Sequence, residues 1–114
     1  MWRHYAESLS TQFHVISIDL LGQGETDSIG YVHSMSEHAR AVKAVLDEES
    51  VEKCKVVGHS MGGYVGLELA NQHPELVDGL VLFHSTAHPD SEERKADRER
   101  IIRLVQHGKS VYIK

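Results

Sequence analysis

Cysteine and proline are scarce in this sequence, which has one cysteine and two prolines among its 114 residues. A single cysteine excludes an intrachain disulfide, and Cys54 lies in an apolar run, which indicates a buried and unreactive thiol. Nine glycines and two prolines make only 11 of the 114 residues, and 40% of the residues are hydrophobic. Collagen-like, disulfide-rich and disordered chains are therefore excluded, and the composition is that of at most one globular domain.

Long apolar runs and an excess of basic residues are also missing. No stretch reaches the roughly 20 apolar residues that cross a bilayer, and no signal-peptide core follows the first residues. We therefore expect a cytoplasmic protein with no membrane partner. Because 12 basic residues stand against 17 acidic ones, the formal charge is −5 and we expect no nucleic-acid partner. The nine histidines include no pair flanked by an acid at metal-ligand spacing, so the sequence predicts no metal site.

Segments with helical and strand periodicity alternate along the chain. Apolar residues recur at helical spacing from Trp2 to Phe13, whereas residues 14–20 alternate as a strand does. The later elements expected from the pattern are a helix opening at Ser34, a strand at 54–57, a helix at 62–73, a strand at 80–83 and a helix from about Asp90 to His107. This order predicts an α/β fold in which a mostly parallel sheet is flanked by helices.

Local signals mark where these helices start and stop. Ser34 and Asp90 each stand three residues before a glutamate, the capping-box pattern of a helix start. Pro74 is expected to end the helix at 62–73, because proline cannot continue a helix. Gly108 is expected to end the last helix.

The motif that indicates a catalytic residue is Gly58-His59-Ser60-Met61-Gly62. It matches G-x-S-x-G and lies between the end of an expected strand and the start of an expected helix. On so tight a turn the serine backbone is strained, and its hydroxyl is lifted above the carboxyl edge of the sheet. Side chains at positions 58 and 62 would clash with the neighbouring strand or helix. The helix behind Ser60 and the backbone N–H of Met61 would stabilise a developing oxyanion. The motif predicts that Ser60 is a nucleophile.

The run from Val57 to Gly63 resembles the nucleophile elbow of the α/β-hydrolase superfamily, in particular its esterase and C–C hydrolase branch. Residues 19–26 are similar to the loop after that family's fourth strand, and residues 71–82 to the passage into its sixth. The resemblance implies that residues 1–114 are a partial α/β-hydrolase domain, from the first helix through strand six to the start of the lid region. It places strands four, five and six at three segments of the chain: residues 14–20, 54–59 and 79–84.

The resemblance also implies that parts of the domain lie outside this chain. In this family the triad acid and histidine follow the later strands, and a second oxyanion donor lies in the loop after strand three. Strand three stands between strands four and five, so residues 14–20 and 54–59 are not expected to pair. We therefore expect the N- and C-terminal strands, the acid and the histidine to be missing here. An isolated 114-residue chain would then be inactive and form no stable sheet.

The implied function is that of a serine hydrolase acting on a small-molecule substrate. Such an enzyme cleaves an ester or related acyl bond through an acyl-enzyme on Ser60, and it needs no cofactor or metal. A C–C bond hydrolase or a cofactor-free haloperoxidase-like enzyme would share the same motif. A non-catalytic truncated product would keep the motif without activity. The sequence predicts no particular oligomeric state.

Other residues near the motif are open to more than one interpretation. His84 and His88 follow the last expected strand and are candidates for the substrate pocket, but neither is expected to be the general base. His59 is expected to pack rather than to react. Asp90 is either a helix cap or, as in family members whose acid follows strand six, the triad acid. Residues 91–103 are either the start of a lid helix or a plain surface helix.

Overall fold

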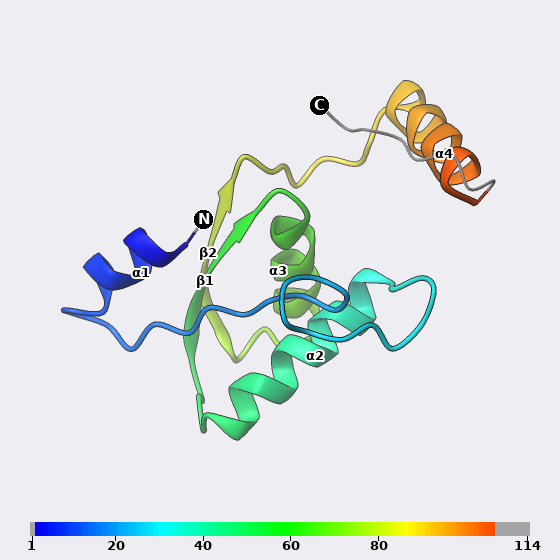
Figure 1. The fold of residues 1–114 in the computed structure, drawn as a ribbon. Helices are drawn as coiled ribbons and strands as arrows, with labels where there is room; N and C mark the ends of the chain where they lie inside the picture. Colours follow the sequence, from blue (N-terminus) through cyan, green and yellow to red (C-terminus); the bar gives the residue numbers. More distant parts are fainter. Residues whose placement is uncertain (1, 107–114) are drawn as a thin grey trace.

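The computed structural model describes residues 2–106 of the chain. A central unit of helices and strands is preceded in the chain by one helix and followed by another (Figure 1). In chain order the elements are α1 (Arg3–Leu9), α2 (Met35–Glu48), β1 (Cys54–His59), α3 (Met61–Gln72), β2 (Val77–Phe83) and α4 (Glu92–Gln106). The predicted α/β class, with a parallel sheet flanked by helices, is confirmed.

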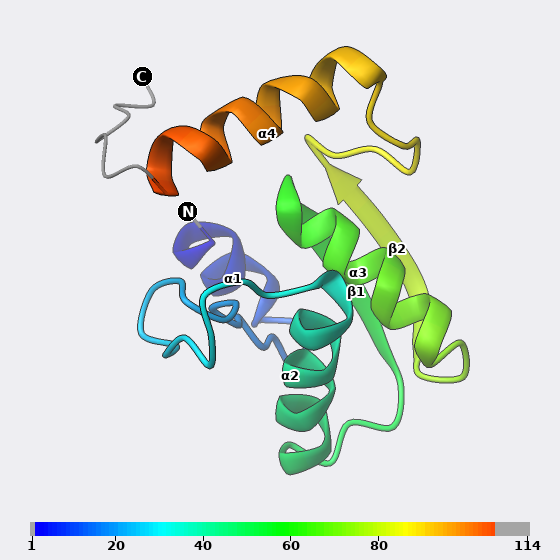
Figure 2. The same cartoon turned by 90° about the vertical axis from the view of Figure 1, so that its right-hand side faces the viewer.

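Strands β1 and β2 form a parallel two-stranded sheet, and α3 is the connection between them. The register pairs Gly58 with Leu82 and His59 with Phe83, so both strands end at the same edge. Helix α3 packs on both strands and α2 packs on α3. The two helices therefore lie on one side of the sheet, whereas α1 lies on the other (Figures 1 and 2).

The hydrophobic core lies where α2 and α3 meet the sheet. Its buried side chains come from these helices and from the turn before β2: Ala39, Leu46, Val65, Leu69 and Leu76. The side chain of Leu69, on α3, has 0% of its surface exposed. Burying one leucine contributes about 1.5–3 kcal/mol, so this cluster is the main force that holds α3 against its neighbours.

Helix α2 begins as predicted, with a complete capping box at Ser34. The Glu37 N–H donates to Ser34 Oγ at 3.2 Å, and the Ser34 N–H donates to Glu37 Oε2 at 2.7 Å. The hydrogen bond from the Ser34 backbone, followed by that from its hydroxyl, lowers the pKa of Glu37. Both partners thus satisfy backbone groups that the first turn of a helix leaves unpaired.

Residues 14–20 do not form the predicted strand. From residue 16 on burial alternates as the pattern indicated: Ile16 and Leu20 are half-buried and pack against the core, while Ser17 and Asp19 are exposed; Val15, expected on the opposite face, is half-buried as well. A strand also needs a neighbour to bond its N–H and C=O groups. Within residues 2–106 the only sheet pairs β1 with β2, so this segment has no ladder partner.

The loop after residue 20 is closed by Asp19. Its carboxylate accepts a hydrogen bond from the Glu25 N–H at 3.1 Å, and its carbonyl accepts one from the Thr26 hydroxyl at 2.8 Å. Gly22 and Gly24 have φ angles of +70° and +52°, the left-handed region that glycine adopts most easily. Turn geometry and the side chains of Asp19 and Thr26 therefore hold this loop.

The boundaries that differ most from the predicted ones are those of α1 and β2; β1 also runs on to His59, and α3 covers Met61–Gln72. Helix α1 ends at Leu9 instead of continuing to Phe13, because residues 10–12 form a turn in which the Gln12 N–H bonds the Leu9 carbonyl, three residues back, at 3.0 Å. Strand β2 begins at Val77, earlier than the predicted start at residue 80, because Val77 already pairs with Cys54. Pairing across the sheet thus extends a strand beyond its most apolar residues.

Helix α4 is capped by Ser91 and not, as predicted, by Asp90. The Arg94 N–H donates to Ser91 Oγ at 3.3 Å, and Ser91 directly precedes the first helical residue. The Asp90 carboxylate instead lies 2.6 Å from Nε of Arg98. The predicted helix end at residues 107 and 108 lies outside the described residues.

Candidate active site

Ser60 stands between the last residue of β1 and the first residue of α3, at the carboxyl edge of the sheet (Figure 1). Its φ is +51° and its ψ is −116°, a backbone conformation that residues with a side chain rarely adopt. The residue is exposed to solvent. Residues 58–63, called the serine turn below, therefore have the strand–turn–helix form that the motif requires, and the strain falls on the serine itself.

The two glycines of the motif differ in their surroundings. A Cβ on Gly58 would lie 2.6 Å from the carbonyl carbon of Gly62 and 2.6 Å from Cα of Gly63, so no side chain fits there. A Cβ on Gly62 would meet nothing within 4 Å. The clash expected at position 58 is confirmed. The clash expected at position 62 is wrong, because a Cβ on Gly62 would point away from the strand.

Two glycines that the motif does not include bring α3 close to the sheet. A Cβ on Gly63 would lie 2.5 Å from Cβ of Ser85, and a Cβ on Gly66 would lie 2.8 Å from Cδ1 of Leu80 and 3.1 Å from Cγ1 of Val56. Sequence reasoning missed both roles. Their spacing of three residues on one helix was the available signal, since it puts them on the same face.

The backbone of Ser60 is held by the end of β2. The Ser60 N–H donates to the Phe83 carbonyl at 3.0 Å, and the Ser60 carbonyl accepts from the Ser85 hydroxyl at 2.8 Å. The same carbonyl accepts from the Gly63 N–H at 3.0 Å. Ser85 was not predicted, although it is the first hydroxyl residue after the strand that neighbours the motif. The strained conformation is therefore fixed from a second element.

Aromatic and imidazole rings gather beside the serine turn. The His59 ring lies 5.8 Å from that of Phe83, 6.0 Å from that of His84 and 6.4 Å from that of Trp2, measured between ring centroids. His59 packs among rings, as predicted. His84 has a φ of +48°, so the chain turns sharply directly after β2.

The structure places the two predicted pocket histidines differently. His84 contacts Phe83 at a centroid distance of 4.7 Å and lies next to His59, beside the serine turn. His88 lies four residues further on, exposed, and its N–H donates to the Thr86 hydroxyl at 3.0 Å. Only His84 is thus brought into a ring contact with the serine turn.

The hydroxyl of Ser60 has no hydrogen-bond partner among residues 2–106. Asp90, the alternative triad acid, is paired with Arg98 instead. The N-terminus of the 12-residue helix α3 follows directly, and the first N–H groups of a helix carry partial positive charge. The serine turn therefore offers an exposed hydroxyl next to a positive helix end.

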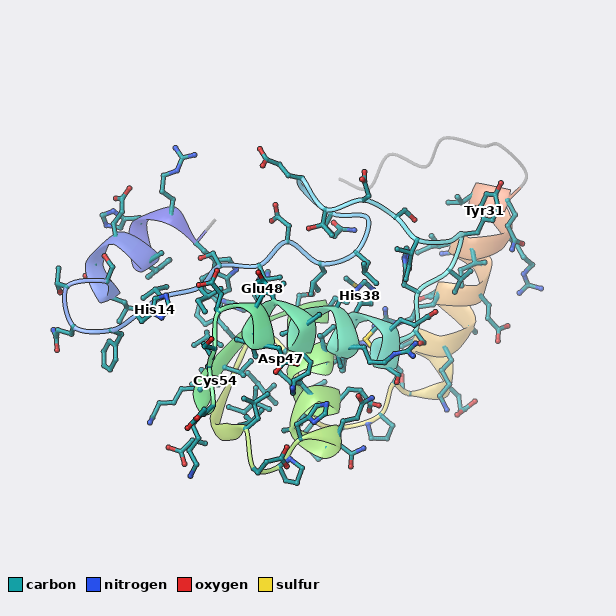
Figure 3. All side chains as sticks on the ribbon, turned by 90° about the horizontal axis from the view of Figure 1, so that it is seen from below. His14, Tyr31, His38, Asp47, Glu48 and Cys54 are labelled. Atoms are coloured by element: carbon teal, nitrogen blue, oxygen red, sulfur yellow. The ribbon has the colours of Figure 1, made fainter. Side chains whose placement is uncertain are left out.

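Cys54 is the first residue of β1 (Figure 3), whereas Ser60 follows the last one. Its thiol is free and half-buried, and burial raises its pKa. A thiol with a raised pKa is protonated at neutral pH and a poor nucleophile, which agrees with the expected lack of reactivity, whereas the expected full burial is wrong. In the part of the chain that the structure describes, no three histidine, cysteine or carboxylate side chains are grouped to hold a metal ion.

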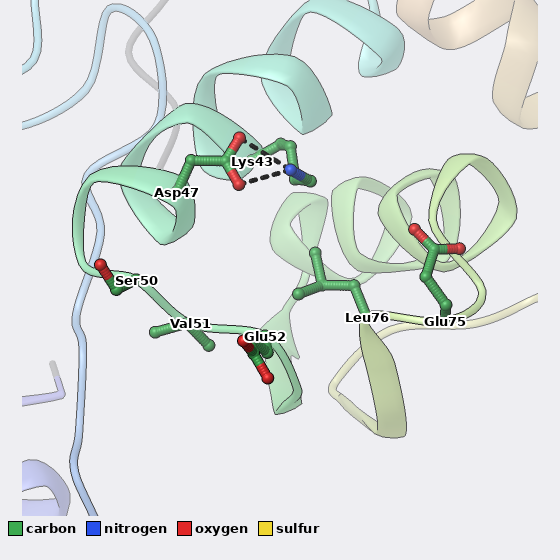
Figure 4. Close-up of a pocket in the computed structure, with 7 residues that line it drawn as sticks. All are labelled: Lys43, Asp47, Ser50, Val51, Glu52, Glu75 and Leu76. Atoms are coloured by element: carbon green, nitrogen blue, oxygen red, sulfur yellow. Dashed lines mark hydrogen bonds and ion pairs between the residues drawn. The ribbon is translucent and has the colours of Figure 1, made fainter.

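A shallow hollow of about 360 Å³ lies between the end of α2 and the start of β2 (Figure 4). The ion pair between Lys43 and Asp47, at 2.5 Å, lies on one wall, and Leu76 lies on the other. Glu52 and Glu75 border it. The hollow is at the amino ends of the strands, whereas ligands of open α/β sheets bind at the carboxyl ends.

His38 is the buried polar side chain of the described core, on α2 (Figure 3). Only 3% of its surface is exposed, and its Nδ1 has no hydrogen-bond partner. Burial is the main cause that lowers its pKa, and the neighbouring His33 ring, 5.5 Å away, acts in the same direction. His38 is therefore neutral at neutral pH.

A family model described as "alpha/beta hydrolase fold" matches residues 1–110. "Putative carbamate hydrolase RutD" of Serratia proteamaculans is 32% identical over 114 residues, which are 99% of this chain and 43% of that protein. The protein of the same name from Azorhizobium caulinodans is 34% identical over 113 residues, again 99% of this chain and 43% of the relative.

Among solved structures, a thermophilic esterase from Thermogutta terrifontis in its malate-bound form superposes with a TM-score of 0.85 at 33% identity. The match covers 95% of this chain and 40% of the esterase. The chain thus spans less than half the length of each of these relatives. No helix within residues 2–106 is long and apolar enough to cross a membrane.

Proposed function

Because the chain belongs to the alpha/beta hydrolase fold family, we propose that it carries the serine nucleophile of a hydrolase that cleaves an ester or related acyl bond. The observation that supports this most is the φ of +51° at Ser60, on an exposed turn between a strand and a helix. Strain of this kind is kept only where the surrounding structure holds it in place. At Ser60 this strained conformation lifts the hydroxyl above the carboxyl edge of the sheet, where open α/β sheets bind ligands.

In the proposed reaction Ser60 Oγ attacks the carbonyl carbon of the substrate, and a general base takes the hydroxyl proton. The carbonyl oxygen becomes an oxyanion that accepts a hydrogen bond from the Met61 N–H, at the positive end of α3. The leaving group departs with a proton, and water then attacks the acyl-enzyme to release the acid and free Ser60. His84, beside the serine turn, and His88 further along the same segment would line the pocket for a small-molecule substrate.

We assign the general base, the acid that orients it and the second oxyanion donor to parts of the protein beyond these residues. Neither a histidine nor a carboxylate bonds Ser60 Oγ within residues 2–106, and a hydroxyl without a base is a weak nucleophile. The isolated 114-residue chain is accordingly proposed to be inactive. A two-stranded sheet is marginally stable by itself, which agrees with that proposal.

The relatives' names favour acyl chemistry over the C–C hydrolase and haloperoxidase alternatives. One solved relative is called an esterase, and two curated relatives are called "Putative carbamate hydrolase". Esters and carbamates share a carbonyl carbon bonded to a leaving heteroatom, so one mechanism serves both. A carboxylic ester is therefore the first substrate class to test, and a carbamate the second.

The experiment uses the full-length protein and its Ser60→Ala variant. Hydrolysis of a short p-nitrophenyl ester should fall by about 10⁴-fold or more, because the nucleophile is lost, and labelling by a fluorophosphonate should disappear. The matched control is Ser36→Ala, which removes a hydroxyl that accepts a hydrogen bond from Gln72 on α3 at 2.8 Å. This control should hydrolyse and label as the wild type does, and the isolated 114-residue chain should do neither. Wild-type labelling of the Ser60→Ala variant would refute the nucleophile assignment.

A further inference from the structure

We infer that Ser85 positions the oxyanion donor of the serine turn, an inference that rests on the function proposed above. The Ser85 hydroxyl donates to the Ser60 carbonyl at 2.8 Å, across 25 residues of sequence. That carbonyl belongs to the peptide group that joins Ser60 to Met61. The other end of the same peptide group is the Met61 N–H, the proposed donor.

The planarity of the peptide bond links the two ends. In a trans peptide the C=O and the N–H point in opposite directions and cannot turn independently, and the described residues contain no cis peptide bond. Fixing the Ser60 carbonyl therefore fixes the direction of the Met61 N–H. As the first residue of α3, Met61 has no carbonyl within the helix to accept its N–H, so this donor is left for a ligand.

The hydrogen bond also strengthens the donor. A hydroxyl that donates to a carbonyl polarises the whole peptide group, and hydrogen bonds joined in such a chain reinforce one another. The Gly63 N–H, at 3.0 Å, donates to the same carbonyl. Two donors on one end of the peptide group thus increase the partial positive charge at its other end.

The surrounding geometry suits this role. The Ser60 N–H bonds the Phe83 carbonyl at 3.0 Å, so the short segment 83–85 holds the strained residue at both of its backbone groups. Between these contacts His84 has a φ of +48°, and the sharp turn lets both neighbours reach Ser60. Gly63 leaves the room that the Ser85 side chain occupies, because a Cβ there would lie 2.5 Å from Cβ of Ser85. Ser85 is a positioning residue, not a catalytic one.

The test is Ser85→Ala in the full-length protein, with kcat expressed per site counted from the end point of fluorophosphonate labelling. We expect kcat to fall about tenfold with KM unchanged, less than the roughly 10²–10³-fold loss that follows removal of an oxyanion donor itself. Binding of an alkyl boronic acid, which forms a tetrahedral adduct on the serine, should weaken by a similar factor. Counting labelled sites removes any contribution from unfolded molecules.

A second variant and a control make the result specific. Ser85→Cys keeps the side-chain volume but offers a weak donor, so its kcat should lie between those of Ser85→Ala and the wild type. Ser36→Ala removes another hydrogen bond between two elements, from Gln72 at 2.8 Å, and should leave kcat unchanged. An equal loss in this control would show a general effect of weakened packing and overturn the role of Ser85.

The remaining outcomes separate this inference from the function on which it rests. If the wild type labels at Ser60 and Ser85→Ala keeps its kcat per labelled site, the positioning role is wrong and the proposed function stands. A higher KM at unchanged kcat would give Ser85 a role in substrate binding and also overturn the inference. If the wild type does not label at Ser60, the proposed function itself fails.

Discussion

Helices α3 and α4 are of similar length, 12 and 15 residues, but different forces hold them. Helix α3 packs on both strands and on α2, and it buries four residues: Gly63, Val65, Gly66 and Leu69. Helix α4 buries no residue and packs on none of the other described helices or strands. A cap at Ser91 and ion pairs along its own surface, such as that of Lys95 with Glu92 at 2.7 Å, stabilise it locally.

The difference shows what is needed to place a functional residue. Local charge pairs contribute a few tenths of a kcal/mol each and can form a helix, but they do not fix where it lies. The position of the serine turn is well defined because the helix that follows it packs closely on the sheet, through Gly58, Gly63 and the core around Leu69. Helix α4 has the charge pattern of either a lid or a surface helix, and its contacts within residues 2–106 favour neither.

The largest expected difference between α3 and α4 concerns one buried side chain on α3 and one exposed side chain on α4. Leu69→Ala should lower the free energy of unfolding by about 2–5 kcal/mol, because the residue is 0% exposed and leaves a cavity. Ile102→Ala on α4, where 54% of the side chain is exposed, should change it by less than about 0.5 kcal/mol. Urea denaturation of the full-length variants measures both. Equal losses would mean that α4 packs on a surface beyond the described residues.

The next prediction concerns the glycines at the start of α3. Gly58→Ala should destabilise the protein by about 1–3 kcal/mol, because its Cβ would lie 2.6 Å from the backbone of Gly63 and the chain must move apart. Gly62→Ala should be neutral or stabilising by up to about 1 kcal/mol, since its Cβ meets nothing within 4 Å and alanine favours helix. Thermal unfolding of the two variants side by side decides the point. Similar destabilisation by both would show that the first turn of α3 is as crowded as β1.

The features that the sequence predicted correctly depend on nearby residues. The capping box at Ser34, the strand–turn–helix around Ser60 and the closed space at Gly58 each follow from a few consecutive positions. Apolar alternation likewise predicted which side chains of residues 16–20 are half-buried. Periodicity and turn chemistry act over a few residues, so sequence patterns report them directly.

The features that were missed depend on contacts outside the pattern that predicted them. The periodicity of residues 14–20 predicted a strand, and only the family resemblance implied, correctly, that this segment does not pair with residues 54–59. Asp90 fitted a cap by spacing, but Ser91 is in the cap position and Arg98, a full two turns along, pairs with the carboxylate. Ser85 acts on Ser60 across 25 residues. Which residues meet across a sheet edge is fixed by register and packing, and a single sequence does not display them.

The smallest expected effect is a pH dependence on the packed side of the molecule. His38 is neutral and buried, and burial lowers its pKa from the usual 6.5, whereas the unfolded chain titrates near that ordinary value. As the pH falls below about 6.5, the unfolded state takes up a proton that the folded state resists, so stability is present at neutral pH and declines on acidification. The urea midpoint should therefore drop between pH 7 and pH 5. His38→Leu should flatten this decline, and His14→Gln, at an exposed histidine, should leave it unchanged. An unaltered pH profile in His38→Leu would mean that other groups cause the decline.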